Sequence, residues 1–273
     1  MAGSLLTVLC TEVKGDQSIQ RADVLAVEQP LEIRLVSGPA ELRSTKTVSV
    51  TMRTPGQDEA LATGFLITEG IISDVERIAS TTLIEQADGS VVLLELQPET
   101  VVDLQRADRN FYTTSSCGVC GKTSIEAVMH AGGIVSSELK MQASVIKKMP
   151  DSLRQAQPLF EKTGGLHASG MFTPDGVIQL VCEDVGRHNA LDKLIGTALR
   201  SGLTFERHAV ALSGRISFEL VQKAVVAGIP VLVAVGAPSS LAVQLADKAN
   251  VTLCGFAGNE RFNIYTHPER ILF

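Results

Sequence analysis

The sequence has neither an excess of basic residues nor a long apolar segment. Its 273 residues include 24 Lys and Arg against 30 Asp and Glu, so the net charge is −6. This balance weighs against broad nucleic-acid binding, which needs a basic surface, although local basic pockets are compatible with it. The longest apolar run, residues 224–237, contains Gly228 and Pro230 and is too short to span a bilayer. We therefore expect no nucleic acid and no membrane among the partners.

Cysteine is also scarce. The five cysteines are an odd, scattered set, which is unlike the disulfide framework of a small secreted protein. No Lys or Arg precedes Lys14, so the first residues lack the charged flank of a signal peptide. We expect a soluble protein of a reducing, cytoplasmic compartment.

The first part of the chain predicts a small α+β domain over residues 1–112. Residues 1–27 show no firm period, and we expect at most partial order there, gained by docking. Beyond them a ββαββ unit is predicted, with a helix that begins at Asp58 and a hairpin turn at 87–89. Its strands are expected at residues 31–36, 47–53, 79–85 and 90–96. A polar connection follows, and we place the domain boundary near Tyr112.

The second part, residues 113–273, predicts a layered α/β domain. Pro150 and Pro158 indicate broken helix or loop over residues 147–163. A hairpin is then expected at 166–172 and 177–182, followed by a helix over 187–200. Strands and helices alternate after that, at residues 209–212, 218–227, 231–235, 241–249 and 251–254. This alternation is typical of parallel strands with crossover helices.

A Ser/Gly-flanked pair of cysteines, Cys117 and Cys120, lies at the start of this second part. Residues 123–126 read Thr-Ser-Ile-Glu, a possible capping box that opens a helix. A helix N-terminus and the neighbouring Lys122 both favour the thiolate form of a nearby cysteine. The thiolate is the form that attacks sulfur or binds a soft metal.

Several chemistries could use this pair. One Cys-x-x-Cys is not a four-ligand zinc site. A zinc deaminase needs a His-x-Glu upstream of the cysteines, whereas His267-Pro268-Glu269 follows them. We therefore expect no metal ligands. A dithiol exchanger, a sulfur carrier that forms a persulfide, and an inert loop pair all stay open at this point.

Three strand-to-helix turns in the second part are rich in small and polar residues: 183–189, 213–217 and 236–240. Ligands of open α/β sheets bind beyond the carboxyl ends of the strands, where helix N-termini point. Backbone N–H groups, Arg187 and Arg215 could hold phosphate there. His188 lies at a predicted helix start, and His167 lies among glycines that let a ligand approach. Each turn alone is also compatible with an ordinary capped turn, but together they favour an anionic ligand.

The chain resembles the FdhD family, the formate dehydrogenase accessory sulfurtransferases, from about Val27 onward. Five stretches carry the resemblance and stand in the family's order. They are Ser116-Cys-Gly-Val-Cys-Gly-Lys122, Gly165-Leu-His-Ala-Ser-Gly170, Glu183-Asp-Val-Gly-Arg-His-Asn-Ala-Leu-Asp-Lys193, Leu212-Ser-Gly-Arg215 and Asn263-Ile-Tyr-Thr266.

The resemblance implies a sulfur carrier. Such a protein accepts persulfide sulfur from a cysteine desulfurase and passes it to the molybdenum cofactor, a bis(molybdopterin guanine dinucleotide), for activation of formate dehydrogenase. By similarity Cys117 would carry the persulfide and Cys120 would assist it. The resemblance also implies a homodimer and a larger domain similar to the cytidine-deaminase fold without its zinc chemistry.

The family's cofactor-binding stretch falls on residues Phe256, Ala257, Gly258, Asn259, Glu260 and Arg261 of this chain. Relatives often have a basic residue where this chain has Gly258, so the contact with the anion rests on Arg261. We expect His167, Arg187, His188 and Arg215 to line the same pocket. A guanine nucleotide alone could occupy it, since the cofactor carries guanine dinucleotides.

Two alternative functions stay open beside sulfur transfer. In the first, the protein is a non-catalytic molybdenum-cofactor chaperone whose Cys-x-x-Cys is a redox latch. In the second, it is a dithiol oxidoreductase that works through a reversible disulfide between Cys117 and Cys120.

Overall fold

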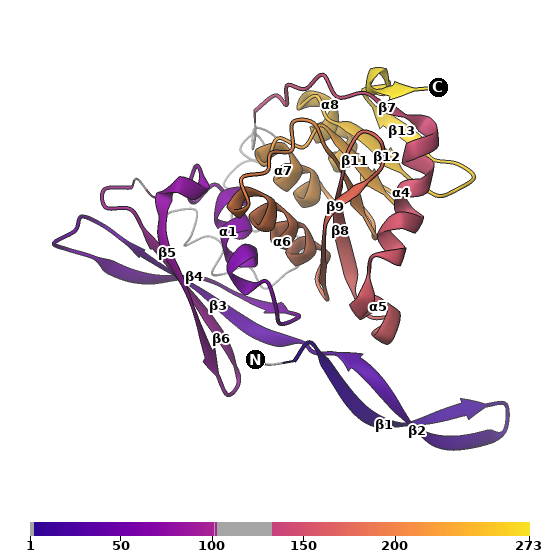
Figure 1. The fold of residues 1–273 in the computed structure, drawn as a ribbon, viewed down its shortest axis with the longest axis horizontal. Coiled ribbons are helices and arrows are strands. Elements are labelled where there is room, and N and C mark those ends of the chain that lie inside the picture. The colour runs from indigo at the N-terminus through magenta and orange to yellow at the C-terminus, as the bar shows by residue number, and fades with distance from the viewer. Residues whose placement is uncertain (1–2, 101, 103–132) are drawn as a thin grey trace.

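The computed structural model describes residues 3–100, 102 and 133–273 (Figure 1). Cys117, Cys120 and the boundary expected near Tyr112 lie outside the described residues. None of the helices described is long and apolar enough to cross a membrane.

The chain begins with a β-hairpin that extends away from the rest of the molecule (Figure 1). Strand β1 (Leu5–Lys14) pairs antiparallel with β2 (Gln17–Ala26) along its whole length. At most partial order was predicted for residues 1–27, and the structure differs in forming two long strands there. The hairpin lacks a visible apolar alternation because Thr, Gln and Ser interrupt the apolar positions.

A four-stranded sheet follows, in the order β4-β3-β6-β5. It is antiparallel apart from the parallel pair β3–β6. Its elements are β3 (Gln29–Ser37), β4 (Ser44–Arg53), α1 (Asp58–Thr68), a 3-10 turn (Val75–Arg77), β5 (Ile78–Gln86) and β6 (Gly89–Leu96). Alternate residues Leu31, Ile33 and Leu35 are buried against α1. The predicted ββαββ unit is therefore confirmed.

The second sheet has six strands in the order β13-β12-β11-β10-β8-β9. Its strands are β8 (His167–Phe172), β9 (Ile178–Asp184), β10 (Ala209–Leu212), β11 (Val231–Ala234), β12 (Thr252–Gly255) and β13 (Asn263–Thr266). The central three, β10, β11 and β12, are parallel, as the alternation of strands and helices predicted. The outer pairs are antiparallel.

Helices cover both faces of this sheet. One face packs on α6 (Arg187–Arg200), α7 (Phe218–Val226) and α8 (Ser240–Lys248). The other face packs on α4 (Ala143–Gln155), which is followed by α5 (Pro158–Thr163). Beside α4 lie two short paired strands, β7 (Met141–Gln142) and β14 (Ile271–Leu272), and a 3-10 turn (Pro268–Arg270) precedes β14. Pro150 was expected to interrupt the helix or to lie in a loop. It lies inside α4, whose apolar side chains Ile146, Met149 and Leu153 hold the helix against the sheet.

The two sheets are joined through α1 and α6, whose backbones touch. A Cβ atom at Gly64 would lie 1.9 Å from the carbonyl oxygen of Asp192, and one at Gly196 would lie 1.9 Å from that of Ala60. Glycine at both positions is therefore what allows the helices to approach so closely. The larger part of the fold is a mixed α/β assembly, and its likeness to the cytidine-deaminase fold stays a prediction.

Candidate functional site

A cavity of about 610 Å³ lies at the carboxyl edge of the parallel strands. One wall is formed by Ser213 and Val235, which directly follow β10 and β11, and by Ala257, two residues after β12. The opposite wall comes from α4, α5 and the segment that leads into β8. Those residues are Pro150, Asp151, Leu153, Arg154, Gln157, Phe160, Gly164, Gly165, Leu166 and His167, with Val185 and Gly258 completing the lining. The position is the one predicted for a ligand of an α/β sheet.

His167, the first residue of β8, lines this cavity and is half-buried. Burial lowers its pKa below the ordinary value of 6.5, and electrostatic interactions with Arg187 and then His188 lower it further. A Cβ atom at Gly214 would lie 3.3 Å from the imidazole ring, so the ring packs directly on that backbone. His167 thus offers a neutral imidazole to a ligand, as a hydrogen-bonding group.

Arg187 and His188 open α6 beside His167. The Nε2 atom of His188 lies 2.9 Å from a carboxylate oxygen of Glu219 and 3.3 Å from the hydroxyl oxygen of Ser217. The Nε atom of Arg187 is buried and has no hydrogen-bond partner among the described residues. Neither Arg187 nor His188 lines the cavity itself, but both lie close enough to influence the His167 ring. Sequence analysis missed Glu219, although a carboxylate in the first turn after the 213–217 segment was a visible signal.

Arg215 lies apart from this group. It is exposed and is not among the residues that line the cavity. Its backbone and side chain pack closely over Gly236, where a Cβ atom would lie 2.9 Å from three Arg215 atoms.

The segment Phe256–Arg261 begins beside the cavity and extends away from it into solvent. Ala257 and Gly258 line the cavity, whereas Phe256, Asn259, Glu260 and Arg261 are exposed. The backbone N–H of Gly258 donates to the carbonyl oxygen of Arg261 at 3.0 Å, and the Asn259 amide donates to the Asp151 carboxylate of α4. A Cβ atom at Gly258 would meet nothing within 4 Å, so a larger residue has room there.

Two features of the cavity wall were not found from the sequence. The Arg154 guanidinium lies over the Phe160 ring, 3.8 Å from its centroid. The Nε2 atom of Gln157 is buried and has no hydrogen-bond partner among the described residues. A flat guanidinium–phenyl pair and an unpaired amide donor are groups that can accept a planar, polar ligand.

Of the segment Glu183–Lys193 only Val185 lines the cavity, and the rest of it forms the base of the site. The Glu183 carboxylate accepts hydrogen bonds from the backbone N–H groups of Leu159 and Phe160, at 3.0 and 2.7 Å, and so fixes the start of α5 beside the cavity. The Asp184 carboxylate lies 2.7 Å from the Lys193 ammonium group, and both are almost fully buried.

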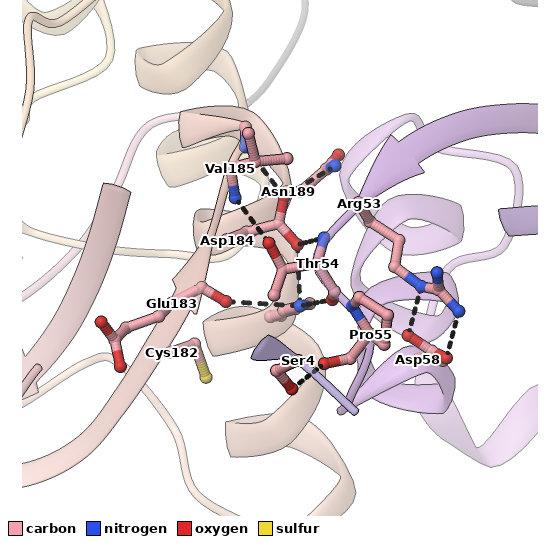
Figure 2. A network of polar contacts seen from close by, with 12 residues as sticks. Ser4, Arg53, Thr54, Pro55, Asp58, Cys182, Glu183, Asp184, Val185 and Asn189 are labelled. Carbon is pink, nitrogen blue, oxygen red and sulfur yellow. Dashed lines mark hydrogen bonds and ion pairs between the residues drawn. The ribbon is translucent and has the colours of Figure 1, made fainter. Parts of the chain in front are cut away.

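The same buried pair holds the N-terminal sheet (Figure 2). The Thr54 N–H donates to Asp184 at 3.1 Å, and Lys193 donates to the Thr54 carbonyl oxygen at 2.8 Å. Next to it, Arg53 forms a two-pronged contact with Asp58, each bond 2.8 Å long. Asp184 and Lys193, which belong to the 183–193 motif, therefore have a structural role, since they join the two sheets behind the cavity.

The two buried cysteines, Cys182 and Cys254, are not set up as nucleophiles. Burial raises the pKa of Cys182, and it raises the pKa of Cys254 to about 12. Both thiols therefore stay protonated. Within the described residues no group of three or more His, Cys, Asp or Glu side chains is placed to hold a metal ion.

Comparison with known proteins agrees with the fold and covers nearly the whole chain. The family model of the FdhD/NarQ family matches residues 26–272. The sulfur carrier protein FdhD of Mycolicibacterium paratuberculosis is 48% identical over 270 residues, 96% of each chain, and that of Streptomyces avermitilis is 46% identical over 261 residues, 92% of this chain and 90% of the relative. The crystal structure of a formate dehydrogenase accessory protein from Desulfotalea psychrophila has the same fold, with a TM-score of 0.77 at 24% identity over 98% of this chain and all of that one. The chain belongs to the FdhD/NarQ family.

Proposed function

We propose that this protein is a cytoplasmic sulfur carrier that serves the maturation of formate dehydrogenase. It takes sulfur from the persulfide of a cysteine desulfurase and delivers it to a bound bis(molybdopterin guanine dinucleotide). The observation that carries the proposal is the full-length similarity to proteins named sulfur carrier protein FdhD. The cavity supports it, because its volume falls within the range of about 300–1,000 Å³ typical of small-molecule sites.

The first step belongs to the Cys-x-x-Cys segment. The Cys117 thiolate attacks the outer sulfur of the desulfurase persulfide, the desulfurase cysteine leaves as a thiolate, and the sulfur is then held on Cys117. Cys120 assists this exchange. The buried, protonated thiols Cys182 and Cys254 take no part.

The cavity holds the second substrate, and a guanine nucleotide alone can occupy it. The Arg154–Phe160 pair and the Gln157 amide offer a stacking surface and a donor to a purine ring. His167 donates or accepts one hydrogen bond as a neutral imidazole, and the Arg187 guanidinium supplies positive charge behind it. Arg261, at the exposed tip of the 256–261 segment, is proposed to contact the anionic groups of the ligand.

A complementation experiment tests the proposal against the chaperone alternative. Cys117→Ala would be expressed in cells that lack the endogenous carrier, and formate dehydrogenase activity would be measured. The sulfur carrier predicts loss of activity, whereas a chaperone with a redox latch predicts that activity is kept. Full function in Cys120→Ala would remove the dithiol oxidoreductase. Cys10→Ser, which changes a thiol on the hairpin, is the matched control and is expected to retain activity.

A further inference from the structure

Helix α5 forms part of the cavity wall, yet little apolar packing holds it in place. It has six residues, and none of them is buried. It also contacts β2 of the N-terminal hairpin, a strand that is itself mostly exposed. By contrast α4, the neighbouring part of the wall, is fixed to the sheet by the buried side chains Ile146, Met149 and Leu153. Elements with few buried apolar contacts open at a lower cost than elements packed into a core, so the cavity has one rigid wall and one weakly held wall.

Glu183, near the end of β9, holds the first turn of α5 with two hydrogen bonds. Its carboxylate accepts the backbone N–H groups of Leu159 and Phe160, at 3.0 and 2.7 Å. Glu183 is 8% exposed, and in the described part of the chain its carboxylate makes no other hydrogen bond. Hydrogen bonds to a carboxylate are stronger than those between neutral groups. This pair of hydrogen bonds, the Glu183 latch, therefore fixes the start of α5 against the cavity.

The other end of α5 is built to turn. Gly164 directly follows the helix with a φ of 66°, in the left-handed region, and Gly165 comes next. A Cβ atom at Gly164 would meet nothing within 4 Å, so the surroundings leave room for this backbone to change its dihedral angles. The hinges of lids are a few residues at the end of an element that absorb such a change. Helix α5 thus has a latch at its first turn and a hinge just after its last residue.

The position of α5 determines which surface the cavity offers to a ligand. The Arg154 guanidinium and the Phe160 ring, which stack at 3.8 Å, belong to α4 and α5 respectively. The stack therefore forms only when α5 lies against the cavity. Gln157 connects the two helices and is 3% exposed, and its amide nitrogen is buried without a hydrogen-bond partner among the described residues. An unsatisfied buried donor is costly, so this wall in its present position has not reached its best polar contacts.

We propose that α5 is a movable gate of the cavity and that Glu183 is the positioning residue that holds the gate closed. When the two hydrogen bonds of the Glu183 latch break, α5 turns about Gly164 and opens a path into the cavity. When they form again, Phe160 returns to Arg154 and the wall closes on the ligand. The gate rests on the proposed function only for the identity of its ligand, a guanine nucleotide, because the latch and the hinge are features of the fold.

Hydrogen exchange followed by NMR tests the latch without any ligand. The amides to observe are those of Glu161 and Gly164, whose acceptors are carbonyl oxygens of the α5 segment rather than Glu183. Glu183→Ala is expected to speed their exchange by about tenfold or more, because the lost hydrogen bonds to a charged group raise the population of open α5. The amides of α6 are expected to exchange as before, which verifies the fold. Equal exchange of Glu161 and Gly164 in wild type and variant would overturn the gate.

Two further variants separate the latch from general damage to the helix. Glu183→Gln keeps one acceptor oxygen, so its exchange is expected to lie between that of the wild type and that of Glu183→Ala, and it still tests the latch if Glu183→Ala does not fold. Glu161→Ala removes an exposed carboxylate from α5 itself, and this matched control is expected to leave the exchange of the Gly164 amide unchanged. An effect of Glu161→Ala as large as that of Glu183→Ala would overturn the latch, because any lost charge would then loosen α5.

Stopped-flow binding of the fluorescent nucleotide N-methylanthraniloyl-GDP tests the gate. Glu183→Ala is expected to raise both the association and the dissociation rate constants by about tenfold, in step with the population of open α5. A variant that was merely less stable would not bind faster, so an unchanged association rate constant would overturn the gate. If the wild type binds no guanine nucleotide while the exchange of α5 responds to Glu183→Ala, the latch is supported and the ligand of the proposed function is wrong.

Discussion

Asp184 and Lys193 show how a recognisable motif can be structural at the level of single residues. Their side chains are 0% and 2% exposed, and each also binds the backbone of Thr54. A buried charge without its partner is strongly destabilising, because its lost hydration is no longer compensated.

We predict that Lys193→Met lowers the free energy of unfolding by about 3–5 kcal/mol. The exposed pair Arg77–Asp74, separated by 3.3 Å, is the control, and Arg77→Met is expected to cost less than about 1 kcal/mol. Urea denaturation measures both. Equal, small effects would show that the buried pair does not join the two sheets.

His167 gives a prediction about pH. Because its folded-state pKa lies below the ordinary 6.5, the unfolded chain binds the proton more readily. The contribution of His167 to stability is therefore complete above the unfolded pKa and is lost as pH falls through the window below 6.5.

NMR titration of the His167 ring should show this lowered pKa. Arg187→Gln is expected to raise it part of the way, since burial is the larger cause and Arg187 the second. A pKa that stays unchanged in Arg187→Gln would mean that Arg187 does not act on the ring.

Single residues of the candidate site could be predicted from the sequence, but contacts between residues far apart in the chain could not. His167 and the pair Ala257–Gly258 were expected at a ligand site, and the structure brings them to one cavity. Asp184 and Thr54 are 130 positions apart, and no local pattern indicates that they meet. Gln157 was missed for the same reason, because its importance comes from burial without a partner.

At the level of elements, the contact of α1 with α6 depends on two glycines. We predict that Gly64→Ala destabilises the fold by about 1–3 kcal/mol, since an added methyl group would overlap the Asp192 carbonyl and force the helices apart. Gly133→Ala, where nothing lies within 4 Å, is the matched control. Thermal unfolding compares them, and equal melting temperatures would contradict the close approach.

The 256–261 segment yields a prediction about ligand binding. We expect Arg261→Ala to weaken guanine-nucleotide binding and to leave persulfide loading intact. Arg207→Ala is the control, because this exposed arginine lies just before β10, at the opposite end of the strand from the cavity. Isothermal titration with a guanine nucleotide measures both. Unchanged affinity in Arg261→Ala would remove Arg261 from the site.

Periodic elements were predicted well, and elements held by distant partners were not. The helix Arg187–Arg200 has the predicted bounds because its apolar stripe is regular. The β1–β2 hairpin was missed because Thr, Gln and Ser interrupt the apolar positions of its two strands. Helix α4 continues through Pro150 because packing against the sheet outweighs the local cost of proline.

For the molecule as a whole, we propose that an acidic chain carries a local site for an anionic ligand. The net charge is −6, yet Arg154, Arg187 and Arg261 gather around or near the cavity. The Cys-x-x-Cys segment, which falls between the two sheets in the sequence, is expected to bring sulfur to that cavity. The family and its fold class followed from the order of the motifs, whereas the cavity wall required the three-dimensional structure.

The central claim is that Cys117 carries sulfur, and intact mass spectrometry tests it most directly. The wild type, Cys117→Ala and Cys120→Ala would each be incubated with a cysteine desulfurase and L-cysteine. We predict that the wild type and Cys120→Ala gain one sulfur atom that reductant removes, and that Cys117→Ala gains none. No gain in the wild type with an active desulfurase, or the same gain in Cys117→Ala, would contradict the claim.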